Sequence, residues 1–293
     1  MKMTNPLRYP GGKYFLAEYI AKVLEFHSLS NCIFYEPYAG SAAVSLKMLS
    51  IGLASEIVLL ERDPMIYSFW KAVTESPEQL CKEIDRLDIN LETWHRLAPL
   101  RQAKTPLEYP TLVLGLAGLF FNRTNYSGIL NANPIGGKRQ NSRYTIDCRF
   151  PKENIKSHIM AIARYRERIT VKWGDAIHFL KEHRSTMENQ RCFVYIDPPY
   201  YEKGKSLYRY YYVDDDHRAL ASLLRICTFP WLVSYDDHPF ITDLYFSQAH
   251  GYWMQRLYLD YNIHNRNHGR ELLISNVQIP PIAQKQSGRA NFA

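Results

Sequence analysis

The chain has 293 residues, 46% of them hydrophobic and 22% charged, so it is long enough to bury a full core and too apolar for bulk disorder. Its 36 Lys and Arg against 29 Asp and Glu give a formal charge of +7, which suits a polyanionic partner but does not by itself establish nucleic-acid binding. The N-terminus is too polar for a signal peptide and no apolar run approaches a membrane span, so we expect a cytoplasmic protein without membrane contact.

The cysteines are scattered and form no CxxC pair, so the sequence predicts neither a zinc site nor a disulfide framework. Reduced thiols in a cytoplasm are the simple interpretation. The five positions are Cys32, Cys81, Cys148, Cys192 and Cys227.

Apolar runs bounded by turn residues predict the first part of a sheet. Cys32–Tyr35 reads as a buried strand, and the turn-rich EPYAGSA and a helical pattern through Leu49 follow it. Ile57–Leu60 reads as a second strand with another helical stretch behind it. Strand, glycine turn, helix and strand in this order are typical of a doubly wound α/β sheet.

The strand signals then stop, and residues from about 72 to 165 look mainly helical with one polar loop. Strands return later, and the last two read as an antiparallel hairpin. The later strands are expected at Ile169–Lys172, Cys192–Ile196, Trp231–Ser234, Gln255–Asn262 and Glu271–Val277. We therefore predict an α/β domain formed by residues 1–71 and 160–279, a helical insert at 72–159, and a polar tail at 280–293.

The tetrapeptide Asp197-Pro198-Pro199-Tyr200 carries the strongest chemical signal, since it follows the apolar run CFVYI. Ligands of open α/β sheets bind at the carboxyl ends of strands. Two prolines remove two N–H donors and leave acceptors, namely the Asp197 carboxylate and the Pro198 carbonyl. Acceptors of this kind would hold both N–H bonds of an exocyclic amine, and Tyr200 offers a flat face for an extruded base. A capped Pro-Pro turn is the plain structural alternative.

Two further strand ends carry weaker signals for nucleotide binding. The loop after the first strand holds Tyr38, Gly40 and small residues, which permit close approach of the backbone to a ligand. Glu61 ends the second strand, about 20 residues past the glycine, where an acid accepts hydrogen bonds from ribose hydroxyls. Asp63 is its close competitor.

Lys13 and Asp175 complete the set of candidate ligands. Lys13 follows a Pro-Gly-Gly turn, and its ammonium suits the carboxylate of a methionine moiety. Asp175 follows a strand in the segment WGDA; it serves either as an acceptor for the amine of a cofactor's adenine or as a helix N-cap, and both interpretations stay open.

The motifs occur in an order that resembles the Dam-like, D12 class of N6-adenine-specific DNA methyltransferases, from residue 5 to about 277. They are PLRYPGGK, YEPYAGSAAV, LLERD, FFNRTNYSGIL, GDA, DPPYY, VSYDD and GRELLISN. The resemblance implies a Rossmann-like fold that uses S-adenosylmethionine, with a helical target-recognition domain inserted before DPPY. It also implies that the cofactor is contacted by Tyr9, Lys13, Glu61 and Asp197.

The expected activity is methyl transfer to the N6 amine of a flipped adenine in double-stranded DNA. Methylation of RNA or of the cytosine N4 amine, or silent DNA binding, are the alternatives. Ala42 stands where the family usually has a second glycine, and Asn131 where GATC-reading members have Arg, so GATC is not the expected target. Besides DNA, a cognate restriction endonuclease acting on the same site is a candidate partner, and no metal is expected.

The segment from Asn122 to Lys152 combines six basic residues, one acid and three glycines, which predicts a basic loop or hairpin. Arg and Asn are the side chains that read guanine and adenine edges. The candidate DNA contacts are Arg123, Asn125, Tyr126, Lys138, Arg139 and Arg143. A second, Tyr- and Lys-rich patch at 201–212 suits a displaced base and its flanking phosphates. The acids Asp214, Asp215 and Asp216 better predict a helix start than a metal site.

Overall fold

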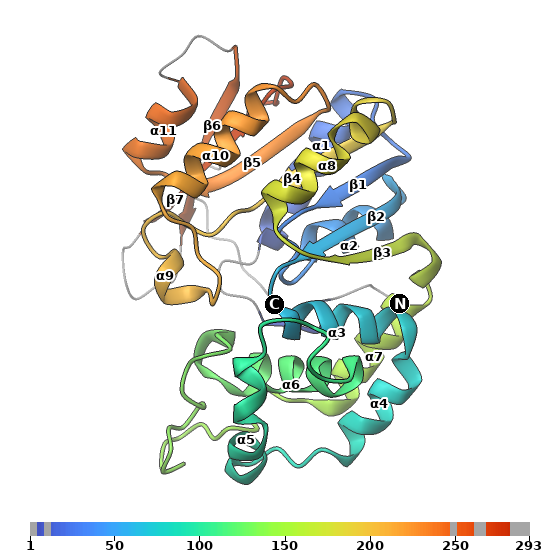
Figure 1. Ribbon diagram of the computed structural model, residues 1–293, viewed down its shortest axis with the longest axis vertical. Coiled ribbons are helices and arrows are strands. Elements are labelled where there is room, and N and C mark those ends of the chain that lie inside the picture. Colours follow the sequence, from blue (N-terminus) through green and yellow to red (C-terminus); the bar gives the residue numbers. More distant parts are fainter. Residues whose placement is uncertain (1–4, 9–12, 247–250, 261–267, 282–293) are drawn as a thin grey trace.

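A seven-stranded sheet forms the centre of the protein (Figure 1). The computed structural model describes residues 5–8, 13–246, 251–260 and 268–281. The strands are β1 (Cys32–Glu36), β2 (Ala54–Glu61), β3 (Ile169–Trp173), β4 (Cys192–Ile196), β5 (Trp231–Asp236), β6 (Trp253–Asp260) and β7 (His268–Ser275). Their order is β3-β2-β1-β4-β5-β7-β6, with β1–β5 parallel and β7 antiparallel to both of its neighbours.

The predicted α/β class is confirmed, and every predicted strand is present. The run CFVYI forms β4 with the predicted bounds, and the last two strands pair as an antiparallel hairpin. The prediction for β6 extended to Asn262, which lies outside the described residues. From β1 the chain adds β2 and then β3 on one side of the sheet. It then returns to β4, on the other side of β1, and adds β5 beyond it, so the direction of strand addition reverses between β1 and β4.

Helices cover both faces of the sheet because its buried strands are apolar on both sides. Phe34 and Leu59 point into one core with α1 (Ala17–Phe26) and α2 (Ala43–Ser50). Their chain neighbours Tyr35 and Leu60 point into a second core with α8 (Ala176–Glu188), α10 (Asp214–Arg225) and α11 (Pro239–Phe246). The predicted helix start at Asp214 is confirmed as the first residue of α10.

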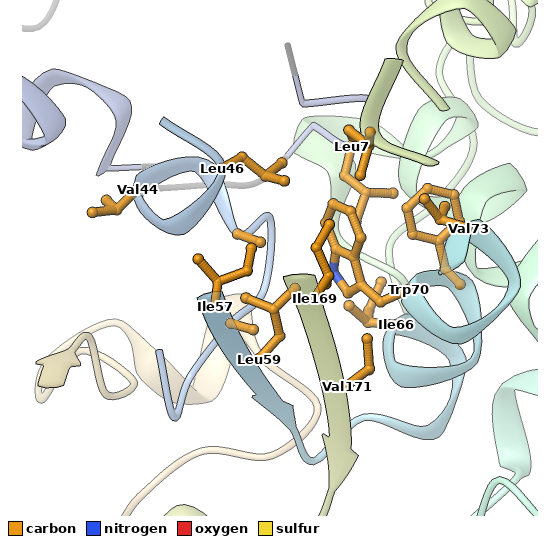
Figure 2. Packing of buried hydrophobic residues seen from close by; sticks show 14 of the residues in the cluster. Leu7, Val44, Leu46, Ile57, Leu59, Ile66, Trp70, Val73, Ile169 and Val171 are labelled. Carbon is orange, nitrogen blue, oxygen red and sulfur yellow. The ribbon is translucent and has the colours of Figure 1, made fainter. Parts of the chain in front are cut away.

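The first core continues into a layer of helices beside the sheet (Figure 1). These helices are α3 (Pro64–Glu75), α4 (Pro77–Arg86), α5 (Leu91–Leu97), α6 (Thr111–Thr124) and α7 (Lys152–Ala163), with short 3-10 turns at Ala98–Gln102 and Tyr126–Gly128. Figure 2 shows Trp70 of α3 among the side chains of Leu7, Ile66 and the strand residue Ile169. Because α3 belongs to this shared core, the helical layer is packed directly on the sheet.

The predicted domain boundaries at 71/72 and 159/160 fall inside α3 and α7. The change in composition at those positions therefore does not coincide with a break in secondary structure, and the division into two domains stays a prediction. Most of the predicted tail, from 282 onward, lies outside the described residues. Within the described ranges, no helix has both the length and the apolar character needed to cross a membrane.

Two glycines of α6 allow it to lie against the backbone of α3. A Cβ added at Gly115 would lie 2.6 Å from the Ser68 carbonyl oxygen, and one at Gly118 would lie 2.7 Å from the Met65 carbonyl oxygen. These distances leave no space for a methyl group, and backbone atoms do not move aside cheaply. The contact between α3 and α6 therefore requires glycine at both positions.

We expect Gly115→Ala to lower the free energy of unfolding by about 1–3 kcal/mol, because the methyl group must separate α3 from α6. Urea denaturation monitored by circular dichroism measures the change. Val113→Ala, at a 43% exposed position of the same helix, is the control and should stay within about 0.5 kcal/mol of the wild type. Equal stability of Gly115→Ala and the wild type would contradict the close packing.

Candidate functional site

Residues at four strand ends, among them the predicted Gly40, Glu61, Asp175 and Asp197, lie around one pocket. Glu36 and Glu61 end β1 and β2, Asp175 follows β3, and Asp197 follows β4. All four line the pocket together with Lys13. Parallel strands bring their carboxyl ends to one edge of a sheet, and the reversal between β1 and β4 opens a crevice there.

Lys13 lies at the centre of a buried charged cluster. Its side chain is 3% exposed, and its Nζ lies 2.9 Å from Asp197 Oδ1 and 3.3 Å from Glu271 Oε2. Nζ also donates to the Tyr200 hydroxyl at 2.9 Å, and that hydroxyl donates to Glu271 Oε1 at 2.7 Å. The two carboxylates raise the pKa of Lys13 well above its usual value despite burial, which lowers it. The ammonium is therefore charged, and it lies within 3.3 Å of two carboxylates and one hydroxyl.

The Asp197 carboxylate is also held from the sheet. The hydroxyl of Ser234 in β5 donates to Asp197 Oδ1 at 2.7 Å, and Ser234 Oγ lies 2.9 Å from the hydroxyl of Tyr195 in β4. Among the described residues, the recorded contacts of this carboxylate go to Oδ1. Oδ2 is thus the oxygen that can accept a hydrogen bond from a ligand.

Glu61 fixes the backbone of the glycine loop. Its Oε2 accepts from the Gly40 amide at 2.9 Å, and its Oε1 accepts from the Asp63 amide at 2.8 Å. The Gly40 carbonyl in turn accepts from the indole of Trp70 at 2.9 Å. Ala42 adopts a left-handed conformation with φ of 50°. That conformation disfavours a residue with a Cβ and favours the glycine that the resemblance places there.

Two carboxyl groups of the pocket are buried enough to change their protonation. Burial raises the pKa of Glu36 to about 8, although the carboxylate accepts a 3.0 Å hydrogen bond from the Ser45 amide. Burial also raises the pKa of Glu61 to about 7. A positively charged ligand in the pocket would restore the ionised form of either group.

Asp63 and Asp175 both act as helix caps. Asp63 accepts from the Met65 amide at the start of α3 and lies 3.2 Å from Arg209 Nη1. Asp175 Oδ1 accepts from the amides of Ile177 and His178 at the start of α8. The N-cap interpretation of Asp175 is thereby confirmed, and its second oxygen, which lies 3.3 Å from Arg62, still borders the pocket.

Tyr-rich residues after DPPY close one side of the pocket. Arg209 also donates to the Ala103 carbonyl in the helical layer at 3.0 Å, so this segment spans from the sheet to the helices. The hydroxyl groups of Tyr38 and Tyr212 lie 2.7 Å apart. Tyr200 itself has the Lys13 ammonium 4.5 Å from its ring centre. Tyr9, predicted as a cofactor ligand, lies outside the described residues.

The predicted DNA contacts fall into two groups. Tyr126, Lys138, Arg139 and Arg143 are exposed, on or beside the irregular segment between α6 and α7. Asn125 is buried, and its side chain accepts from the Trp94 indole and donates to two backbone carbonyls. We therefore leave Asn125 out of the DNA-contacting set, since its hydrogen-bonding groups are used inside the protein.

Arg123, at the end of α6, is intermediate in exposure between the exposed residues and the buried Asn125. Its Nε is buried and has no hydrogen-bond partner among the described atoms. Burial, together with the charges of Arg8 and Arg149, lowers the pKa of Arg123 to about 10. A group of three arginines without an acidic partner in the described part of the chain is a favourable place for an anion.

Sequence reasoning missed Glu36, Ser234 and Glu271. Glu36 is an acid at the end of a strand, as Glu61 is, so the argument that predicted Glu61 as a ligand-binding residue applies to Glu36 as well. Ser234 and Glu271 lie on β5 and β7, and only the pairing of these strands brings them beside the DPPY segment. No spacing in the sequence indicates that proximity.

Comparison with known proteins gave a family and solved structures of similar fold. The family model of the D12 class N6 adenine-specific DNA methyltransferase matches residues 9–271. A crystal structure from Pyrococcus horikoshii, described as that of a "putative RNA methyltransferase", is 13% identical and has a TM-score of 0.40, over 92% of this chain and 84% of that one. That likeness is too distant to bear on the substrate. The comparison with curated proteins gave no significant match.

We expect Glu36→Gln to be more stable than the wild type at pH 8, with the difference vanishing toward pH 4.5. The folded protein keeps the Glu36 proton up to a pKa of about 8, whereas the unfolded chain loses it near 4.5. The unfolded state therefore binds fewer protons between these values, and stability of the wild type falls as the pH rises, by on the order of 1 kcal/mol per pH unit. Urea titrations at pH 5, 6.5 and 8 measure this; parallel stability curves for the two proteins would contradict it.

Proposed function

The chain belongs to the D12 class of N6 adenine-specific DNA methyltransferases, and we propose that it transfers a methyl group from S-adenosylmethionine to a specific adenine of double-stranded DNA. The observation that carries this proposal is the joint placement of Asp197, Lys13, Glu36 and Glu61 around one pocket at the strand ends. The amine of the target base must reach Asp197, so we infer that the adenine is flipped out of the duplex.

Asp197 and the two prolines after it would orient the amine. Ser234 and Lys13 hold Asp197 Oδ1, which leaves Oδ2 to accept one N–H bond while the Pro198 carbonyl accepts the other. The nitrogen lone pair is then directed at the methyl donor, and the negative charge of Asp197 stabilises the positive charge that develops on the amine. Pro199 lines the pocket, and the Tyr200 hydroxyl is hydrogen-bonded to Lys13 and Glu271 beside it.

The residues of the pocket fit S-adenosylmethionine by their charge and burial. Glu36 and Glu61 are buried carboxyl groups with raised pKa values, and both suit a ligand that brings an ammonium group and ribose hydroxyls. Tyr38, Gly40 and Asp175 border the same pocket. When bound, the cofactor supplies an electrophilic methyl group. We assign Lys13 to the support of Asp197 rather than to the cofactor carboxylate, because its ammonium is buried among Asp197, Glu271 and Tyr200.

DNA would lie along the exposed basic loop between α6 and α7. Tyr126, Lys138, Arg139 and Arg143 are exposed there, and the partly buried Arg123 lies close to Arg8 and Arg149, a grouping of positive charge that suits a phosphate. Gly128, Leu130 and Asn131 of this loop also line the pocket, so a base flipped toward Asp197 would pass the loop that reads its neighbours. The recognition sequence is to be found by sequencing modified bases in cells that express the chain.

The proposal is tested by incubating the protein with labelled S-adenosylmethionine and duplex DNA of mixed sequence, followed by nucleoside analysis. Label on N6-methyladenine supports it. Label on cytosine alone, on structured RNA offered in parallel but not on DNA, or on protein alone would refute it.

Asp197→Ala should lower the methyl-transfer rate by at least ~10²-fold, since it removes one preorganised group that stabilises developing charge. DNA affinity should change little, because phosphate contacts supply most of it. Single-turnover kinetics and a binding titration separate the two effects. A variant with near-normal turnover would mean that Asp197 has only a structural role.

Substitutions in the basic loop should change DNA recognition and leave cofactor affinity unchanged. Arg143→Ala is expected to cost about 1–3 kcal/mol on the proper site and to relax the preference at one base position. Lys138→Ala should instead weaken binding to all sequences alike and reduce its salt dependence. Titrations of duplexes with single base changes at two salt concentrations measure both. If both variants kept the wild-type base preference and the wild-type salt dependence of binding, this loop would not recognise the DNA sequence. The Tyr-rich segment at 201–212 would then be the candidate for that role.

A further inference from the structure

Glu271 is a buried carboxyl group outside the pocket that contacts the residues supporting Asp197. It lies on β7 and is 3% exposed. Its Oε1 accepts from the Tyr200 hydroxyl at 2.7 Å and its Oε2 lies 3.3 Å from Lys13 Nζ. Lys13 and Asp197 line the pocket, and Glu271 does not. The contacts that Glu271 makes toward the pocket therefore go through Lys13 and Tyr200.

The charge balance of the cluster explains why a second acid is useful. Lys13 and Asp197 alone would form a neutral pair, and an ammonium 2.9 Å from the carboxylate opposes the attraction of Asp197 for positive charge on the amine. Glu271 shares the same ammonium and brings the cluster to one net negative charge. It also draws Lys13 toward β7, which fixes the side of Asp197 that faces the ammonium.

We propose that Glu271 is a positioning residue for methyl transfer, which acts through Lys13 and Tyr200 to hold Asp197 in place and to keep the cluster negatively charged. This inference rests on the proposed function of the same site. It assigns no contact between Glu271 and either substrate.

The protonation of Glu271 gives this role a pH signature. Burial raises the pKa of Glu271 to about 6, while the Lys13 ammonium opposes that rise. The charged and titratable groups that face it come from three elements. They are Lys13 from the 3-10 turn Lys13–Leu16, Asp197, Tyr200 and Tyr208 from the segment after β4, and Asp236, its register partner on β5. Below about pH 6 the carboxyl group is protonated and the cluster is neutral, so the rate should fall as the pH drops through this value.

The test compares the wild type with Glu271→Gln, which keeps the size and an acceptor oxygen but removes the charge. We expect the single-turnover rate at pH 7.5 to fall on the order of 10- to 100-fold, with the dissociation constants for S-adenosylmethionine and for duplex DNA within about twofold of the wild type. The fall in rate below pH 6 should disappear in this variant. Glu271→Asp retains the charge, so it should recover part of the rate and should again show a fall in rate at acid pH.

Asp237→Asn is the matched control, because Asp237 forms a 3.2 Å ion pair with Arg256 and has no recorded contact with Lys13 in the described residues. It should keep the wild-type rate and pH profile. The proposal would be overturned by a Glu271→Gln variant that has the wild-type rate. It would also be overturned by a variant that is slower but still loses rate below pH 6 as the wild type does. If that variant does not fold, a wild-type rate that stays constant from pH 5 to 8 overturns it instead. A wild-type chain that methylates no adenine would contradict the proposed function rather than the role of Glu271.

Discussion

The burial of one ammonium group, that of Lys13, is the constraint on which the site depends. A charge removed from water is costly unless it is paired, and loss of one partner leaves the other charge uncompensated. Lys13 satisfies this requirement with Asp197, Glu271 and Tyr200, which come from the segment after β4 and from β7. The 3-10 turn Lys13–Leu16, the DPPY segment after β4 and the antiparallel strand β7 are thereby held together at one point. The added hairpin of the sheet is thus part of the site as well as of the core.

The acids of the pocket show a different balance between stability and binding. Glu36 and Glu61 are buried without a cationic partner among the described residues, and burial of their charged forms, which raises both pKa values, is costly for the folded protein. The Glu61 carboxylate offsets part of the cost by accepting two backbone amides that shape the glycine loop. A cationic ligand would offset the rest of the cost of burying these carboxylates. The affinity of such a pocket for its ligand therefore comes partly from groups that destabilise the empty protein.

Local patterns predicted the sheet and the pocket well, because both follow from short-range rules. The continuous apolar run of β4 and the turn residues after it place Asp197 at a strand end, and parallel topology then gathers the other strand ends beside it. Contacts that depend on distant pairing were not predictable. The register of β7 with β5 brings Glu271 to Lys13, 258 positions away in the chain by their residue numbers. The composition of the basic loop predicted a DNA contact for Asn125, but composition does not tell whether a side-chain amide is exposed, and that of Asn125 is buried.

The helical layer and the pocket edge of the sheet are joined by close contacts between backbones. Gly115 and Gly118 bring the backbone of α6 against α3, and α3 begins at the Asp63 cap beside Glu61. At the far end of α6, the Asn122 side chain accepts from the Arg8 amide at 2.7 Å and donates to the Arg8 carbonyl at 2.5 Å. Arg8 lies five residues before Lys13 in the chain. The end of α6 that carries Arg123 is therefore hydrogen-bonded to the N-terminal segment 5–8.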